Sequence, residues 1–297
     1  MSLKLSVIIP SVTGWSDLER CLRALISQAD TQPVELVVPE RLGGDLPAKI
    51  KDSFPQCVVI EMAGDSTIPA MRALGFERSS GDAIAVLEDH VIVPTDWAKN
   101  MLHALTESDG VVAGAVENGA TTTLMDRAAF LCEYSHCMPP IEGGAVEWLT
   151  GNNVVYRREL IDQHEDILKL HKWENVLHDA MKDGGARLIC HPEIVVSHEL
   201  HYGPFDYFGQ RYLYARSYAG ARVRGFPLHK RLIFGCAAFI LPPILLFRIF
   251  SRVYAKRRDR GTLFASIPLI LLFVMAWAWG EIVGYWFGAG DSLARVR

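Results

Sequence analysis

Three polar residues, Glu88-Asp89-His90, directly follow the short apolar run Ala83–Leu87. The run reads AIAVL, which is typical of a strand that is buried on both faces. A carboxylate at the end of a buried strand is costly unless a partner neutralises it, and a divalent cation with a diphosphate has the charge to do so. The triplet therefore predicts a metal and diphosphate site, with a simple capped turn as the alternative.

The elements that must position this triplet are short runs rich in β-branched residues. They are Leu5–Pro10, Val34–Pro39, Cys57–Met62 and Ala83–Leu87. Helix-like stretches separate the runs, and such an alternation predicts a parallel α/β sheet. Ligands bind beyond the carboxyl ends of the strands in these sheets, which adds the strand exits at Pro10 and Glu40 to the expected site.

The net charge of −4 conceals two halves of opposite sign. Residues 1–200 hold 16 Lys and Arg against 30 Asp and Glu, whereas residues 201–297 hold 14 against 4. With 50% hydrophobic residues the chain can bury a large core, which excludes a fibre, a mini-protein and a nucleic-acid-binding tail. The two halves are expected to meet partners of opposite charge.

Two apolar segments follow a basic, aromatic stretch at residues 205–231. Leu232–Phe247 contains Pro242-Pro243, whereas Thr262–Gly280 has 19 uncharged residues, enough to span a hydrocarbon core of about 30 Å. If both segments crossed, the basic loop between them would lie outside, against the tendency of Lys and Arg to stay in the cytosol. We therefore expect a basic interfacial segment at 205–231 and a membrane region at 232–297, with 232–250 re-entrant or spanning and 262–287 transmembrane.

Six motifs, in the same order, resemble those of the family 2 glycosyltransferases, which are inverting enzymes with a GT-A fold. The segment from Leu87 to Trp97 is similar to the family's LDDDVVPPPDWL and matches its frame without a gap. The other matches are Ser6–Pro10 to SVIIP, Asp17–Gln28 to LxxCLxSLxxQ, Ile68–Asp82 to ARNxGxxxAxGD, Leu149–Arg158 to GxNxAFRR and Ala180–His198 to RLRRAGYRLxxxPEAxVxH. The C-terminal AWAWGEIVGYWFG also resembles the tails of membrane-associated bacterial members.

The resemblance implies a Rossmann-like GT-A domain of the nucleotide-diphospho-sugar transferase type, with a mainly parallel sheet, followed by membrane helices. After Asp109 the pattern becomes mixed. We expect strands at Val111–Val116, Asn153–Arg157, Arg187–Cys190 and Glu193–His198, and helices at Leu124–Tyr134 and Trp173–Lys182. We therefore predict a catalytic domain at residues 1–204, with a nucleotide-binding part at 1–110 and an acceptor part at 111–204.

The family's aspartate-x-aspartate motif faces the nucleotide ribose and a metal-bound diphosphate. The matching frame implies that Glu88 and Asp89 bind the nucleotide-sugar, and that Glu88 and His90 hold a divalent metal, Mn²⁺ or Mg²⁺. His90 stands where an Asp is usual in the family. Imidazole suits Mn²⁺-like ions better than Mg²⁺, so this substitution bears on metal preference.

Further nucleotide contacts follow from the same resemblance. Glu40 stands where the family has an Asp that reads the base, although a solvated loop at Glu40-Arg41 is an equal alternative. Arg72 matches the family's Arg in ARN and is expected to contact the nucleotide phosphates. Pro10, at the exit of the first strand, completes the expected nucleotide-sugar site.

Inverting transfer needs a base beside the acceptor hydroxyl, because the nucleophile loses its proton as it attacks. The family supplies this base from an acidic pair about eleven residues before an Ala-Gly turn. In this sequence that frame falls on Trp173-Glu174, which makes Glu174 the expected base and Asp179 the reserve. The alternative is that Glu174 is only a favourable charge at a helix N-terminus.

His198, Arg211 and Arg216 are the expected acceptor and diphosphate contacts. The segment Gln210–Arg216 resembles the QxxRW region of processive members, but the Trp is replaced, so we expect transfer of a single sugar. The two arginines either bind diphosphate oxygens or face anionic lipid.

These features predict a metal-dependent glycosyltransferase of the hexosyltransferase type. It would move one sugar from a nucleotide-sugar to a lipid-linked or glycolipid acceptor in cell-envelope or exopolysaccharide synthesis, as a possible homo-oligomer with no nucleic-acid partner. The six scattered cysteines favour reduced thiols and hence a catalytic domain on the cytosolic side of the inner membrane. The alternatives are a catalytically degenerate GT-A scaffold in a polysaccharide-assembly complex and a nucleotidyltransferase.

Overall fold

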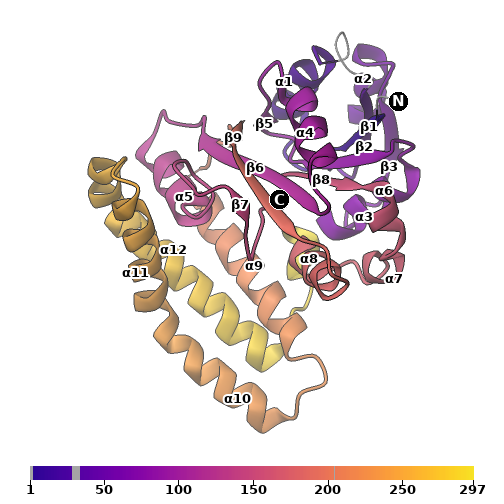
Figure 1. Cartoon of the computed structure of the whole chain (residues 1–297). Coiled ribbons are helices and arrows are strands. Elements are labelled where there is room, and N and C mark those ends of the chain that lie inside the picture. Colours follow the sequence, from indigo (N-terminus) through magenta and orange to yellow (C-terminus); the bar gives the residue numbers. More distant parts are fainter. Residues whose placement is uncertain (1–2, 29–33, 204) are drawn as a thin grey trace. The chain divides into compact units, whose positions relative to one another are not determined.

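The computed structural model describes residues 3–28, 34–203 and 205–297, and the chain divides into two compact units (Figure 1). Unit 1 comprises Met1–Glu117 and Pro139–Glu199, and unit 2 comprises Asn118–Met138 and Leu200–Arg297. The sequence placed residues 118–138 in the acceptor part, whereas the structure groups them with the C-terminal helices. The predicted domain boundary at residue 204 lies outside the described residues.

Four parallel strands form one half of the sheet in unit 1, in the order β3-β2-β1-β4. The strands are β1 (Leu5–Ile8), β2 (Val34–Glu40), β3 (Val58–Glu61) and β4 (Ala83–Leu87), and the helices between them are α1 (Trp15–Ile26), α2 (Leu46–Ser53) and α3 (Ile68–Arg78). All four strands lie where the apolar runs predict them. Because the strands are parallel, the ends of β1, β2 and β4 meet at one edge of the sheet.

Five further strands complete the nine-stranded sheet of the described residues. They are β5 (Val91–Ile92), β6 (Val111–Asn118), β7 (Gly144–Ala145), β8 (Asn153–Arg157) and β9 (Leu188–His198), with helices α4 (Trp97–Thr106), α6 (Arg158–Asp162), α7 (Glu165–Leu168) and α8 (Glu174–Asp183). β8 is antiparallel to β4 and β6, and β9 is antiparallel to β5 and β7. The predicted α/β class is confirmed, as a mixed sheet with a parallel half.

One strand prediction was wrong in detail. The two strands expected at Arg187–Cys190 and Glu193–His198 are a single strand, β9, which runs through Pro192. Proline removes one backbone donor, but its fixed φ is compatible with extended backbone at a position outside the ladder. The strand therefore continues without a break from Leu188 to His198.

Unit 2 is helical. Its elements are α5 (Leu124–Tyr134), α9 (Asp206–Arg222), α10 (Leu228–Ala237), η1 (Ala238–Ile240), α11 (Leu241–Ala255), α12 (Arg260–Phe287) and η2 (Ser292–Arg295). Figure 1 shows α12 between α9 and the segment formed by α10 and α11. Pro242-Pro243 does not interrupt that segment, because both prolines stand in the first turn of α11, where the missing N–H groups have no intrahelical partner.

Two helical segments of the described residues are long and apolar enough to cross a membrane. They are Leu228–Ala255, which includes α10 and α11, and Arg260–Phe287, which is α12. This finding rests on length and composition alone, and part of Arg260–Phe287 is buried within the structure.

One buried amide ties together the antiparallel half of unit 1. The Nδ2 of Asn153, on β8, donates to the carbonyl oxygens of Ala115 on β6 (2.9 Å) and Ile194 on β9 (3.0 Å). Its Oδ1 accepts from the indole N–H of Trp97 on α4 at 2.9 Å. Gly114 permits this approach, since a Cβ there would lie 2.0 Å from the carbonyl oxygen of Ile194.

Replacing this amide tests how much of the fold depends on it. Asn153→Ala leaves two buried carbonyl oxygens and one indole N–H without their partner, so we expect the free energy of unfolding to fall by about 3 kcal/mol. Urea unfolding followed by circular dichroism measures the change. The exposed Gln163→Ala is the matched control, and equal stability of the two variants would contradict the role of Asn153.

Candidate active site

Glu88, His90 and His198 each bring one ligand-type atom to the end of β4. The pairing of β5 with β9 sets Val91 opposite His198, which places the two imidazoles side by side. Their Nε2 atoms are 2.9 Å apart, and Glu88 Oε2 lies 3.4 Å from His90 Nε2 and 3.8 Å from His198 Nε2. The three atoms lie within 4.8 Å of one another, which is close enough for all of them to bind one metal ion. We call Glu88, His90 and His198 the metal-type group.

Asp89 is fully buried and holds this group in place. Its Oδ2 accepts from the backbone N–H groups of Val12 (2.6 Å) and Thr13 (2.8 Å), in the loop that follows β1. Its Oδ1 lies 3.1 Å from Nδ1 of His90. The resemblance implied a nucleotide contact for Asp89, but in the structure its carboxylate is engaged by the protein itself. Asp89 therefore orients His90, as carboxylates behind metal-binding histidines do.

The protonation states of the three groups are strongly coupled. Burial would lower the pKa of His90, but the hydrogen bonds and negative charges of Asp89 and Glu88 outweigh burial and raise this pKa to about 10. Burial and the positive charge of His90 lower the pKa of His198 to about 3. Burial would raise the pKa of Glu88, but His90 and Arg72 hold it well below its usual range. At neutral pH His90 thus carries a proton that a cation can replace.

The donor set fits a divalent metal ion. Glu88 supplies a carboxylate oxygen, His90 and His198 supply imidazole nitrogens, and Asp89 fixes the orientation of one imidazole. Two nitrogens and one oxygen favour Mn²⁺ over Mg²⁺, which prefers oxygen ligands alone. The structure therefore adds His198 to the predicted pair of Glu88 and His90.

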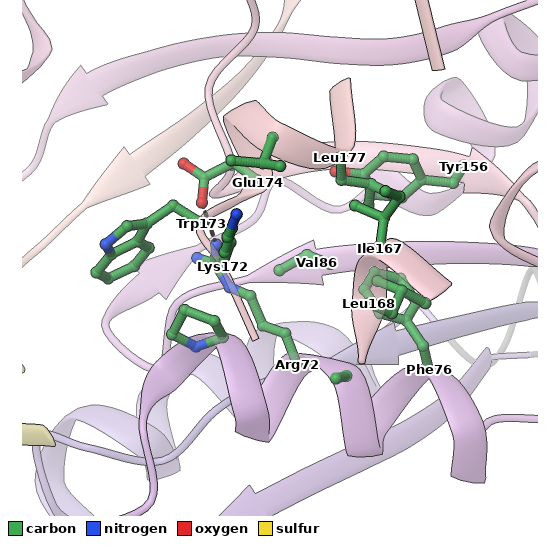
Figure 2. Close-up of a pocket in the computed structure, with 14 residues that line it drawn as sticks. Arg72, Phe76, Val86, Tyr156, Ile167, Leu168, Lys172, Trp173, Glu174 and Leu177 are labelled. Atoms are coloured by element: carbon green, nitrogen blue, oxygen red, sulfur yellow. Dashed lines mark hydrogen bonds and ion pairs between the residues drawn. The ribbon is translucent and has the colours of Figure 1, made fainter. Parts of the chain in front are cut away.

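A second carboxylate, Glu174, stands at the first position of α8 and faces α3. Figure 2 shows Arg72 extending from α3 towards it, and Arg72 Nη1 donates to Glu174 Oε2 at 2.7 Å. The two side chains line a cavity of about 30 Å³ together with Trp173, Lys172 and apolar residues of α3, α7 and α8. This volume admits one or two water molecules or a hydroxyl group.

The loop before β8 connects Glu174 to the metal-type group. The Nδ2 of Asn152 donates to Glu88 Oε2 at 3.0 Å, and the preceding Gly151 packs on Glu174, where a Cβ would lie 2.4 Å from the carboxyl carbon. Arg72 acts on both acids, because its charge also lowers the pKa of Glu88. The predicted base and the predicted metal residues therefore belong to one site in unit 1.

A buried Tyr–His pair lies next to Glu174. Tyr156 OH is 2.8 Å from His178 Nε2, one turn after Glu174 on α8. Burial, and then the charge of Arg72, lower the pKa of His178 to about 4, although the negative charge of Glu174 opposes them. The sequence did not indicate Asn152, Tyr156 or His178. The only signal available for the first two was their place in the LTGNNVVYRR motif.

The other expected residues of unit 1 occupy different positions. Pro10 is buried at the exit of β1, and Glu40 ends β2, where its carboxylate accepts from the backbone N–H groups of Leu42 and Gly43. Burial raises the pKa of Glu40. Asp179 is exposed on the outer side of α8 and pairs with Lys182 at 3.6 Å, so the structure does not bring this reserve base into the cluster.

Arg211 and Arg216 belong to α9 in unit 2. The guanidinium of Arg211 stacks over the ring of Trp277 at 4.1 Å, and Arg216 Nε donates to the carbonyl oxygen of Gly288 at 3.2 Å. Both arginines therefore bind α12 and its C-terminal end within their own unit.

The geometry of unit 1 defines a class of protein. A parallel half-sheet carries a metal-type group at the end of its fourth strand, with a carboxylate base candidate beside it, as in nucleotide-diphospho-sugar transferases of the GT-A fold. The model of glycosyl transferase family 2 matches residues 6–164, more than half of the chain. The chain belongs to glycosyl transferase family 2, and this confirms the resemblance found in the sequence.

Solved structures share the fold. The crystal structure of S. aureus TarS 1-349 is 15% identical, with a TM-score of 0.50, and the match covers 94% of this chain and 90% of that one. Mannosyltransferase PcManGT from Pyrobaculum calidifontis, solved in complex with GDP-Man and Mn²⁺, is 14% identical, with a TM-score of 0.52 and coverage of 97% and 86%. A comparison with curated proteins found no match.

His178 makes the stability of the fold sensitive to acid. Its pKa of about 4 lies below the ordinary 6.5, so between these values the unfolded chain binds a proton that the folded chain excludes, and stability falls as the pH falls. From pH 7 to 4.5 we expect wild type to lose about 2 kcal/mol more than His178→Gln. Urea unfolding at both pH values measures this, with the exposed His103→Gln as control. Equal losses in wild type and His178→Gln would exclude this contribution.

Proposed function

We propose that this glycosyltransferase moves one sugar from a nucleotide-sugar to a membrane-held acceptor, with inversion at the anomeric carbon. The observation that carries the proposal is Arg72, whose charge acts on Glu88 of the metal-type group while its guanidinium binds Glu174. Donor activation and proton abstraction would thus take place close to one and the same guanidinium.

The donor binds where β1, β2 and β4 end, with its diphosphate at Glu88, His90 and His198. A divalent metal held there would neutralise the diphosphate as it leaves, and Mn²⁺ is the best fit to the donor atoms. PcManGT, with its GDP-Man and Mn²⁺, supports a nucleotide-sugar and a metal for this fold. Glu40 and Pro10 lie at the same edge of the sheet and border the nucleotide.

Glu174 takes the proton of the acceptor hydroxyl at a carboxylate oxygen. Arg72 fixes the orientation of this carboxylate by its 2.7 Å hydrogen bond, and Gly151 leaves room for it beside the loop. The small cavity next to Glu174 suits a single hydroxyl group, which would hold the nucleophile against the base and exclude bulk water. Attack on the face of the sugar opposite the leaving diphosphate would invert the anomeric carbon.

The acceptor is proposed to be a lipid-linked or glycolipid molecule of cell-envelope or exopolysaccharide synthesis. Support comes from the two apolar helical segments and from the basic C-terminal third of the chain, which suit an anionic lipid headgroup. The catalytic unit would then work at the cytosolic face of the inner membrane.

Replacing Glu174, the proposed base, distinguishes an active enzyme from a catalytically degenerate scaffold. We expect Glu174→Gln to lower kcat by about 10² to 10⁴-fold with little change in donor affinity, because the proton acceptor is lost while Glu88, His90 and His198 are left unchanged. The measurement is release of nucleoside diphosphate from UDP-, GDP- and dTDP-sugars with Mn²⁺, with and without a polyprenyl phosphate in detergent. Asp179→Asn is the control and should keep the wild-type rate. A fully active Glu174→Gln would disprove the assignment, and a folded wild type that binds no donor would favour the degenerate scaffold.

Removing a metal ligand tests the triad. Loss of even an outer partner lowers the affinity of metal sites about 10- to 100-fold, so His90→Ala and His198→Ala should each raise the Kd for Mn²⁺ by at least about tenfold. Titration of Mn²⁺ followed by electron paramagnetic resonance gives the Kd directly. The exposed His103→Ala should bind like wild type. Unchanged binding in the His198 variant would leave only Glu88 and His90 as ligands.

A further inference from the structure

Helix α12 has two dissimilar faces. One face is buried within unit 2, whereas the other carries apolar side chains that are 41% to 73% exposed. These exposed residues are Phe264, Leu271, Leu272, Met275, Trp279 and Phe287. The neighbouring segment formed by α10, η1 and α11 exposes a similar set, Leu232, Ile233, Phe239, Ile240, Ile244 and Phe247. Contiguous exposed apolar surface of this kind indicates a lipid or protein contact.

The buried face of α12 lies against helices that carry charges. α5 and α9 pack on it, and α9 runs parallel to its second half. The rings of Tyr207 and Phe273 are 4.6 Å apart near the start of α9, and Arg211 covers Trp277 four residues further along. Towards the end of α12, Arg216 binds the carbonyl oxygen of Gly288.

Small residues make this pairing close. A Cβ on Gly280 would lie 2.4 Å from the carbonyl oxygen of Tyr212, and one on Gly284 would lie 2.6 Å from that of Arg216. Backbones in such direct contact, by a Gly-x-x-x-Gly pattern, pack tightly. Any placement of α12 in a membrane therefore carries α9 with it.

A spanning α12 would put α9 in an unfavourable place. The 28 residues of α12 form a helix about 42 Å long, and Phe273 lies near its middle. If α12 crossed the bilayer, Tyr207 would lie near the midplane, and the first N–H groups of α9 and the neighbouring Asp206 would be surrounded by hydrocarbon. Arg211, which covers Trp277, would then lie only about 6 Å beyond the midplane and still within the hydrocarbon. Unsatisfied backbone groups and charges at these depths are expensive.

We propose that α10, α11 and α12 lie in the plane of a single leaflet of an anionic membrane, and that neither apolar segment spans it. The exposed apolar rows face the acyl chains, and α5 and α9 remain on the water side, as in interfacial amphipathic helices. This placement differs from the transmembrane 262–287 expected from the sequence. It depends on unit 2 alone and is independent of the sugar chemistry proposed for unit 1.

The distribution of positive charge supports an in-plane arrangement. Basic residues gather at both ends of the apolar segment, at Arg222, Arg224, Lys230 and Arg231 before it, and at Arg248, Arg252, Lys256, Arg257, Arg258 and Arg260 after it. A spanning hairpin would separate these two clusters onto opposite sides of the membrane. Lying in the plane, both clusters reach the anionic headgroups of the same leaflet.

Labelling of single cysteines distinguishes the two arrangements. In the full chain with Cys236→Ser, which removes the exposed cysteine, cysteines are placed at Arg224, Gly261 and Asp291, with Glu147→Cys in unit 1 as reference. In inside-out bacterial membrane vesicles an impermeant maleimide should label all four sites to a similar extent, and in intact spheroplasts none. Labelling of Gly261→Cys or Asp291→Cys from the outer face would overturn the proposal.

Vesicle binding tests whether the apolar rows contact lipid. Purified protein is added to preformed vesicles of phosphatidylcholine with about 30% phosphatidylglycerol, and the bound fraction is measured by flotation. Leu272→Glu/Met275→Glu should weaken binding by about tenfold or more, whereas Leu170→Glu, an exposed apolar position of unit 1, should not. Circular dichroism verifies that each variant is folded. The lipid contact would be refuted if the wild-type protein did not bind the vesicles. It would also be refuted if the protein, without detergent, formed a dimer and stayed unbound.

Discussion

The fully buried carboxylate of Asp89 is the contact on which the arrangement of the site depends. It accepts hydrogen bonds from two backbone N–H groups of the loop after β1, which are 77 and 76 residues away in the chain, and it binds the imidazole of the next residue. One side chain therefore joins the exits of β1 and β4. A buried carboxylate is tolerated only when its oxygens are satisfied in this way. Asp89, which orients His90 of the metal-type group, is therefore itself held by backbone N–H groups. The parallel sheet determines the positions of those groups.

Charge balance explains how so many ionisable groups share this edge of the sheet. Glu88, Asp89 and Glu174 are opposed by Arg72 and a protonated His90, so the cluster holds negative and positive groups in close alternation. These groups sum to one negative charge, so a divalent cation in place of the proton of His90 would bring the cluster to neutrality and would present its own charge to a diphosphate. The arrangement suits a site that must accept a highly charged ligand in a partly buried place.

The sequence predicted the local elements well and the long-range contacts poorly. β4, β8 and α5 have the bounds that the sequence predicted, and for β4 the reason is that burial on both faces leaves a continuous hydrophobic signal. The contact of His90 with His198 spans 108 residues and that of Arg72 with Glu174 spans 102, and no periodicity encodes such pairs. His198 was accordingly expected at the acceptor, although strand pairing places it beside the metal residues. In unit 2, the hydropathy of the sequence identified α12. It did not indicate that Gly280 and Gly284 allow the charged helix α9 to pack closely against α12.

The peptide link between Gly151 and Asn152 has a mechanical consequence. One of these neighbours packs on Glu174 and the other binds Glu88, and consecutive Cα atoms are held about 3.8 Å apart. A ligand that draws Glu88 towards itself therefore pulls on the backbone that borders Glu174. The positions of the two carboxylates are thus mechanically linked through two adjacent residues of one loop, although Glu88 and Glu174 lie 86 residues apart in the chain.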